Sequence, residues 1–156
     1  MGPNHARRLP TESWSNAAGW TVWIPVGWER DPDSLDEAFV PPSGLGRLSI
    51  HTQRARQAVE ISEAFARQQA TRLLPDAGLL GRWRSPPDDV EELGVNHLAV
   101  VRTGRNRGRQ HYSVVHVFPP GLIVYARWHT SERDDPDWDD GVAAARSIAP
   151  GDIPAR

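Results

Sequence analysis

Alternating apolar and polar positions predict strands in both halves of the chain. In residues 20–28, apolar side chains occupy every second position, which is the period of a strand with one buried face. Strand patterns recur at 37–40, 47–51, 78–84, 95–102, 110–118 and 122–130. Short connections join the last three, which predicts an antiparallel meander.

A change of period predicts two helices. Between about residues 60 and 74, apolar side chains recur every three to four residues, with glutamine, arginine and glutamate between them. Pro75 and Gly78 end this segment. A second helix is predicted after DDPDWDD, because apolar residues step by three or four from Trp138 to Ile148. Acidic residues at its start complement the helix dipole.

The predicted meander carries apolar residues on both faces. We place on one face Leu98, Val100, Tyr112, Val114, Phe118, Val124, Ala126 and Trp128. We place on the other Ala99, Val101, Val115, Val117, Ile123 and Tyr125. An antiparallel sheet with one face in water would be apolar on one side only. We therefore expect an α+β fold, in which helices cover a mostly antiparallel sheet.

Length and hydropathy limit the organisation of the chain. At 156 residues one domain is expected, with a flexible N-terminal arm at 1–18, a single α+β domain at 19–150 and a C-terminal tail at 151–156. The longest apolar run, at 121–126, is far too short to cross a bilayer. The first twenty residues lack the apolar stretch of a secretion signal. We expect a cytoplasmic protein with no membrane insertion.

Composition excludes several kinds of chemistry. The chain has no cysteine, which excludes disulfides, thiolate nucleophiles and cysteine-ligated metal centres. All 18 basic residues are arginine, so a Walker loop and pyridoxal phosphate chemistry, both of which need lysine, are excluded as well. This arginine bias suggests a GC-rich bacterial genome. A net charge of -2 argues against a nucleic-acid partner, and we predict no cofactor.

Several phrases of the sequence resemble PsbP-like and DcrB-like domains over about residues 20–150. WTVWIPVGWE resembles their opening strand and its turn, through Pro25, Gly27 and Trp28. GRLSIHTQRA is similar to their next hairpin, and GLIVYARWHT followed by DWDDGVAAARSIAP to their closing strand and helix. The resemblance implies a PsbP-like αβα sandwich.

The resemblance also implies a binding role. Its members include extrinsic subunits of the oxygen-evolving photosystem, a Ran-binding nuclear import factor and chaperones of type VI secretion effectors. Most of them act by binding, and they share no catalytic motif, so no residue role is transferred. The chain departs from the lipoprotein and lumenal members because it lacks their export signal.

The stretch TGRNRGRQ is a candidate anion-binding loop. Its cations are Arg105, Arg107 and Arg109. Glycine and asparagine supply the positive φ that a hairpin turn needs, so a plain turn explains the stretch more simply. A contact with an anion or an acidic partner remains the alternative.

Two histidines form a candidate metal pair. If the PPG turn pairs Phe118 with Leu122, then His111 lies opposite His129 on one face of the sheet. A metal site needs a third ligand, and the pattern places no carboxylate there. We predict that they are polar surface histidines and that no metal is bound.

The tryptophans are candidates for a recognition surface. The chain has 7 of them, and most fit core positions by periodicity. Trp23 and Trp83 point the other way or lie on weak strands. Exposed tryptophan and arginine dominate binding hot spots, so we expect a partner to contact Trp23 and Trp83 together with Arg82 and Arg84.

These patterns favour a non-catalytic protein-binding module. We expect an adaptor, chaperone or immunity-type protein, associated with a secretion system, whose partner is another protein. No G-x-S-x-G elbow and no spacing that defines a catalytic triad is found in the sequence. The alternative is a small-ligand-binding protein or a hydrolase that uses histidine and carboxylate residues.

Overall fold

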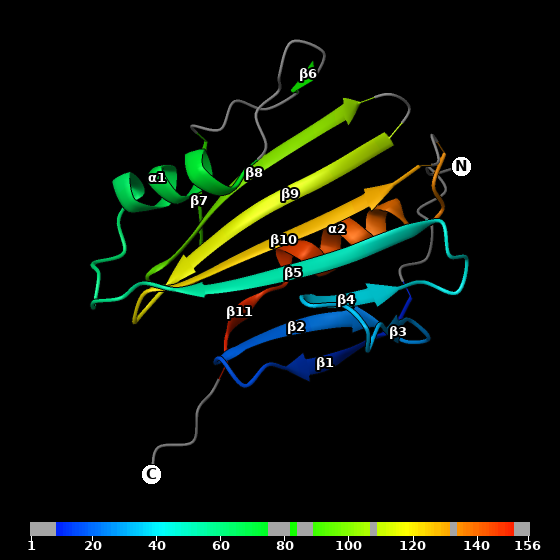
Figure 1. The fold of residues 1–156 in the computed structure, drawn as a ribbon, viewed down its shortest axis with the longest axis horizontal. Coiled ribbons are helices and arrows are strands. Elements are labelled where there is room, and N and C mark those ends of the chain that lie inside the picture. The colour runs from blue at the N-terminus through cyan, green and yellow to red at the C-terminus, as the bar shows by residue number, and fades with distance from the viewer. Residues whose placement is uncertain (1–8, 75–81, 84–88, 107–108, 132–133, 152–156) are drawn as a thin grey trace, which may run out of the picture.

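The computed structural model describes residues 9–74, 82–83, 89–106, 109–131 and 134–151. Within these ranges the chain forms two antiparallel sheets and two helices (Figure 1). Neither helix in the described ranges has the length and apolar character needed to cross a membrane. The α+β class predicted from the sequence is confirmed.

The larger sheet has eight strands in the order β3-β4-β5-β10-β9-β8-β6, and β7 pairs with β8. These strands are β3 (Glu29–Arg30), β4 (Glu37–Val40), β5 (Gly46–Arg54), β6 (Arg82–Trp83), β7 (Val90–Gly94), β8 (His97–Asn106), β9 (Arg109–Phe118) and β10 (Leu122–Thr130). The predicted meander is present as β8, β9 and β10. On the far side of β10 lies β5, so the centre of the sheet consists of four long antiparallel strands.

The smaller sheet has the order β1-β2-β11. Its strands are β1 (Thr11–Ser15), β2 (Trp20–Pro25) and β11 (Ala149–Pro150). The prediction of a flexible arm over 1–18 is wrong for residues 11–15, because β1 pairs with β2 along its whole length. The segment TESWS is polar and mostly exposed, so its hydrophobicity pattern does not predict a strand. The strand is stabilised by backbone hydrogen bonds to β2.

The two helices are α1 (Glu63–Leu73) and α2 (Trp138–Arg146), close to the predicted positions. Ser62 caps the start of α1, since its Oγ accepts a hydrogen bond from the N–H of Phe65 at 3.1 Å. Asp139 and Asp140 lie in the first turn of α2, where carboxylates stabilise the positive end of the helix dipole.

The helices cover opposite faces of the larger sheet, as the sequence predicted. On one face, α2 and the smaller sheet enclose the main core, which includes Trp20, Leu48 and Trp128. On the other face, α1 packs against β7, β8 and β9 through Phe65 and Ala66. Figure 1 shows α1 over one end of β8 and β9, which leaves the rest of that face beyond the helix.

The face assignment predicted for β8 is wrong. Leu98 pairs with Val117, and Val100 pairs with Val115, so Leu98 and Val100 face α1. Ala99 belongs instead to the main core. The hairpin between β8 and β9 sets this register, and a shift of one residue exchanges the two faces of a strand.

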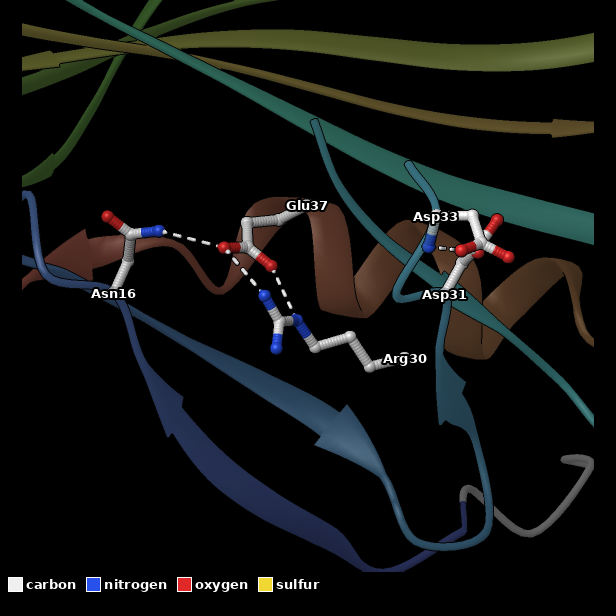
Figure 2. Close-up of polar contacts among 5 residues, drawn as sticks. All are labelled: Asn16, Arg30, Asp31, Asp33 and Glu37. Carbon is white, nitrogen blue, oxygen red and sulfur yellow. Dashed lines mark hydrogen bonds and ion pairs between the residues drawn. The ribbon is translucent and has the colours of Figure 1, made fainter. Parts of the chain in front are cut away.

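Polar contacts join the smaller sheet to the edge of the larger one (Figure 2). The Nε of Arg30 donates to Glu37 Oε2 at 2.8 Å, and the amide of Asn16 donates to Glu37 Oε1 at 3.4 Å. The guanidinium of Arg30 also lies 5.3 Å from the centre of the Trp14 ring. These contacts hold the β1–β2 hairpin beside β3 and β4.

Candidate functional site

A row of basic side chains crosses the larger sheet from strand to strand. Gly104 on β8 pairs with His111 on β9, and His111 pairs with His129 on β10. His129 in turn pairs with Arg47 on β5. Residues directly opposite each other on neighbouring strands point to the same side of the sheet. The row therefore lies on one face.

A second row runs beside the first on the same face. It consists of Arg102, Ser113, Arg127 and Ser49, which are paired in that order. Arg109 lies two residues before His111 on β9 and so points to the same side. We call the surface formed by Arg47, Arg102, Arg109, His111, Arg127 and His129 the basic face.

The sequence of each strand explains why α1 packs beside the basic face and not on it. On β9, the side chains that point to this side change from Val117 and Val115 to Ser113 and His111. On β10, they change from Ile123 to Arg127 in the same direction. A helix gains free energy by covering apolar surface, so α1 packs on the apolar end of the face.

Burial and neighbouring arginines lower the pKa of both histidines in the basic face. The pKa of His111 is lowered to about 4, first by burial and then by the charges of Arg127, His129 and Arg102. The pKa of His129 is also lowered, first by burial and then by Arg127, Arg47 and Arg109. Both imidazoles are therefore neutral at pH 7, because positive neighbours and burial each disfavour the charged form.

Burial differs across the basic face. Arg102 and His111 are 6% and 5% exposed, Arg127 and His129 are half-buried, and Arg109 is exposed. Electrostatic interactions are stronger for partly buried groups than for exposed ones, because less water screens them. An anion that reached these side chains would therefore be held more strongly than on an ordinary surface.

Acidic residues lie at the β5 edge of the basic face. Asp31 accepts from Arg47 at 2.8 Å, and this hydrogen bond lowers the pKa of Asp31. A second hydrogen bond, from the N–H of Asp33, also lowers it, and Figure 2 shows this second bond. Asp36 lies 2.8 Å from Nδ1 of His51. Because His51 pairs with Tyr125 rather than with the histidine row, this carboxylate–histidine pair is separate from His111 and His129.

The predicted pairing of His111 with His129 is confirmed by the register of β9 and β10. The prediction that both are surface histidines is wrong for His111, which is buried. In the part of the chain that the structure describes, no group of three or more histidine, aspartate or glutamate side chains could hold a metal ion. The charges of Arg47, Arg102, Arg109 and Arg127 act on the two imidazoles and would repel a cation. The surroundings of the two imidazoles thus fit an anion better than a metal.

The stretch TGRNRGRQ belongs largely to strands. β8 continues to Asn106, which pairs with Arg109 at the start of β9, so the two strands form the predicted hairpin. Arg105 pairs with Gln110 on β9 and with Arg82 on β6. Arg107 lies outside the described residues, as does Arg84.

The two candidate tryptophans lie on different parts of the molecule. Trp83 pairs with Gly104, which places β6 next to the histidine row. Trp23 is 50% exposed on β2 of the smaller sheet, and its backbone N–H donates to Ser147 on the α2 side. Figure 1 shows β6 and β2 far apart, so the predicted single surface with Trp23, Trp83 and Arg82 does not form.

Sequence reasoning missed Arg47, Arg102 and Arg127 as members of a site. Each lies in a predicted strand, and in 122–130 the alternation already places Arg127 and His129 on one side. The site could have been predicted from this alternation together with the register of the four central strands, β5, β10, β9 and β8. The register of β8 with β9 could not be read from hydrophobicity.

Comparisons with known proteins establish the fold. No protein-family model and no curated protein matches the sequence. The solution structure of cyanobacterial PsbP (CyanoP) from Synechocystis sp. PCC 6803 is similar with a TM-score of 0.50 and 15% identity, over 96% of each chain. A crystal structure from Bacteroides thetaiotaomicron VPI-5482 gives a TM-score of 0.54 at 11% identity and covers 92% of this chain. This chain spans only 48% of that protein.

Together with the two helices and the antiparallel sheets, these likenesses show that the chain has a PsbP-like α+β fold. The resemblance seen in the sequence is confirmed at the level of fold. Folds of this kind host unrelated functions, so the role of the chain has to be argued from its site.

Proposed function

We propose that the chain is a non-catalytic protein-binding module, an adaptor or chaperone, that holds an acidic segment of another polypeptide on its basic face. One observation carries this proposal: two adjacent cross-strand rows, together with Arg109, gather four arginines and two histidines on the part of the sheet beyond α1. Carboxylates would form charge-assisted hydrogen bonds with these arginines. We place this activity in the cytoplasm, as the sequence led us to expect.

The dimensions of the basic face fit a short extended segment. From β5 to β8 there are three steps between neighbouring strands, each about 4.8 Å, so the rows span roughly 14 Å. An extended polypeptide advances about 3.3 Å per residue, so about four residues cross the face. Acidic side chains at alternate positions would point toward the sheet along this path.

The hydrolase alternative has less support. It needs a carboxylate that converges with His111 and His129, and no such cluster exists among the described residues. The carboxylate–histidine pair that does form, Asp36 with His51, has its Nε2 side occupied by the amide of Gln53 at 3.1 Å. These contacts tie up both ring nitrogens of His51.

The first prediction concerns binding of a defined acidic peptide. A fluorescein-labelled peptide of ten glutamates should bind the full chain, and fluorescence anisotropy should show affinity falling as salt is added. Arg127→Gln should weaken binding about tenfold, which is the typical effect of losing a hydrogen bond between charged groups. Exposed Arg109 provides a second variant, Arg109→Gln, that leaves buried packing intact.

The matched control is Arg67→Gln, which removes the same charge from the exposed surface of α1, where Arg67 lies 3.7 Å from Glu63. It should bind like the wild type. If Arg67→Gln and Arg127→Gln weakened peptide binding equally, the loss of net charge alone would explain the effect, and the proposal would be contradicted. Tighter binding of a ten-nucleotide thymidine strand than of the peptide would also contradict it.

A further inference from the structure

The strand β1 forms an open edge of the smaller sheet. The order of that sheet is β1-β2-β11, so β2 pairs with one edge of β1, and no strand in the described ranges pairs with the other. Figure 1 shows β1 at the lower margin of the molecule, below β2. The side chains of β1 are exposed apart from Trp14, which is half-buried. An exposed edge of this kind can accept a further strand.

The hydrogen bonds at the two ends of β1 show which backbone groups point to the open edge. The N–H of Asn16 donates to the carbonyl oxygen of Trp20 at 2.9 Å, and the N–H of Val26 donates to that of Pro10 at 2.8 Å. The backbone groups of successive residues in a strand point to alternate edges. The even-numbered residues of β1 therefore face β2. The N–H and C=O groups of the odd-numbered residues face outward, and these residues are Thr11, Ser13 and Ser15.

The sequence of β1, TESWS, is complementary to itself across a two-fold axis. If two copies pair antiparallel about Ser13, this serine lies opposite its own counterpart, and Thr11 of each copy lies opposite Ser15 of the other. In this register every outward N–H and C=O group of both strands has a partner, which gives about six hydrogen bonds. Pairs of small hydroxyl side chains on neighbouring strands add to the stability of such a pairing.

Charge complementarity supports the same register. Glu12 and Trp14 point to the side of β1 that faces the larger sheet, where Trp14 packs against Phe39. Across the two-fold axis, Glu12 of one copy lies directly opposite Trp14 of the other. The guanidinium of Arg30 lies 5.3 Å from the centre of the Trp14 ring, and its Nη1 takes no part in the two bonds to Glu37. Each Glu12 is thus placed beside Arg30 of the other copy.

We propose that β1 is a dimerisation edge, at which a second copy of the chain adds its own β1, antiparallel about Ser13, and joins the two smaller sheets into one. On the outer side, Trp23 pairs with Ser13, so two exposed indoles lie on one row with two serines between them. Two five-residue strands bury less surface than the roughly 1,600 Å² of a standard interface, so the dimer is transient. The inference is independent of the proposed function, because the basic face belongs to the larger sheet.

The second prediction tests this edge with a proline. Sedimentation velocity of the full chain, from roughly 10 μM to 1 mM, should show a shift from monomer to dimer. Ser13→Pro should abolish the shift, because the ring removes the central outward N–H. Since that N–H does not face β2, the pairing of β1 with β2 is retained. Ser13→Ala is the matched control, because it keeps the N–H and should dimerise within a few-fold of the wild type.

Charge reversal tests the register and does not depend on how the proline variant folds. Glu12→Arg should weaken dimerisation several-fold, because it places a second cation beside Arg30 of the other copy. Glu60→Arg makes the same change at an exposed position just before α1 and should dimerise like the wild type. If the two variants weakened dimerisation equally, net charge alone would explain the effect, and the register would be wrong.

Hydrogen exchange of backbone amides identifies the surface that the dimer uses. The amides of Thr11, Ser13 and Ser15 should become protected as the protein concentration rises, while those of Glu12 and Trp14 are protected by β2 in the monomer as well. A chain that stays monomeric at about 1 mM, or a dimer whose newly protected amides lie elsewhere, would overturn the proposal. If a peptide of alternating threonine and valine protected the same three amides while the chain itself stayed monomeric, the edge would bind a foreign strand instead of a second copy.

Discussion

At the residue scale, a single tryptophan determines how closely α2 approaches the sheet. The indole of Trp128 is fully buried and stacks on Trp28, with ring centres 5.1 Å apart. Gly46 on β5 and Gly141 on α2 lie against this ring, and a Cβ at either position would overlap it. Small residues at two distant points of the chain therefore make room for one large residue.

The third prediction follows from this packing. Gly141→Ala should lower the free energy of unfolding by about 1–3 kcal/mol, because the added methyl forces the indole or the helix to move. Chemical denaturation measures the change. Gly94→Ala is the control, since the nearest atom to its added methyl, the Cβ of His97, lies 3.7 Å away. A Gly141→Ala protein as stable as the control would contradict this account of Trp128.

At the element scale, most strands and both helices were predictable because their apolar periods are strong. β1 was missed because TESWS has no apolar period, and its membership of a second sheet depends on pairing with β2. The basic face was missed for a related reason. Alternation along β10 shows that Arg127 and His129 point to the same side of the sheet. Which residues of β5, β8 and β9 point to that side as well depends on the register of these strands.

A buried histidine pair ties β8 and β9 to α2. Nε2 of His116 donates to the carbonyl oxygen of Ala145 at 2.8 Å, which leaves its Nδ1 to accept from Nε2 of His97 at 2.9 Å. Burial lowers the pKa of His97 to about 4 and that of His116 to about 3, where the charge of His97 adds to the effect. This chain of hydrogen bonds requires His116 to be neutral, because its Nδ1 accepts, and burial keeps His97 neutral as well.

The fourth prediction concerns acid stability. Both pKa values are lower in the folded protein, so the unfolded chain binds more protons below about pH 6.5. The free energy of unfolding should therefore fall as pH decreases from about 6.5 toward 4. His97→Gln/His116→Gln should flatten this slope. If the double variant does not fold, the NMR signals of His116 in the wild type provide the test, and a protonated ring at pH 5 would contradict the prediction.

At the scale of the whole molecule, the two faces of the larger sheet have different roles. The face toward α2 and the smaller sheet is closed by the main core. The other face is apolar under α1 and basic beyond it. The exposed Trp23 lies on the smaller sheet, in a groove of about 330 Å³ with Pro25 and Ala143, away from the basic face. The basic face and the exposed apolar groove at Trp23 thus lie on different parts of the molecule.

The fifth prediction concerns the position of the partner. In an NMR titration of the isotope-labelled chain with the ten-glutamate peptide, the amide signals of Arg47, Arg102, His111, Arg127 and His129 should shift together. Those of Trp23 and Ser147, in the groove beside α2, should stay in place. Shifts confined to the groove, or no shifts at low salt, would contradict the claim that the basic face binds an acidic segment.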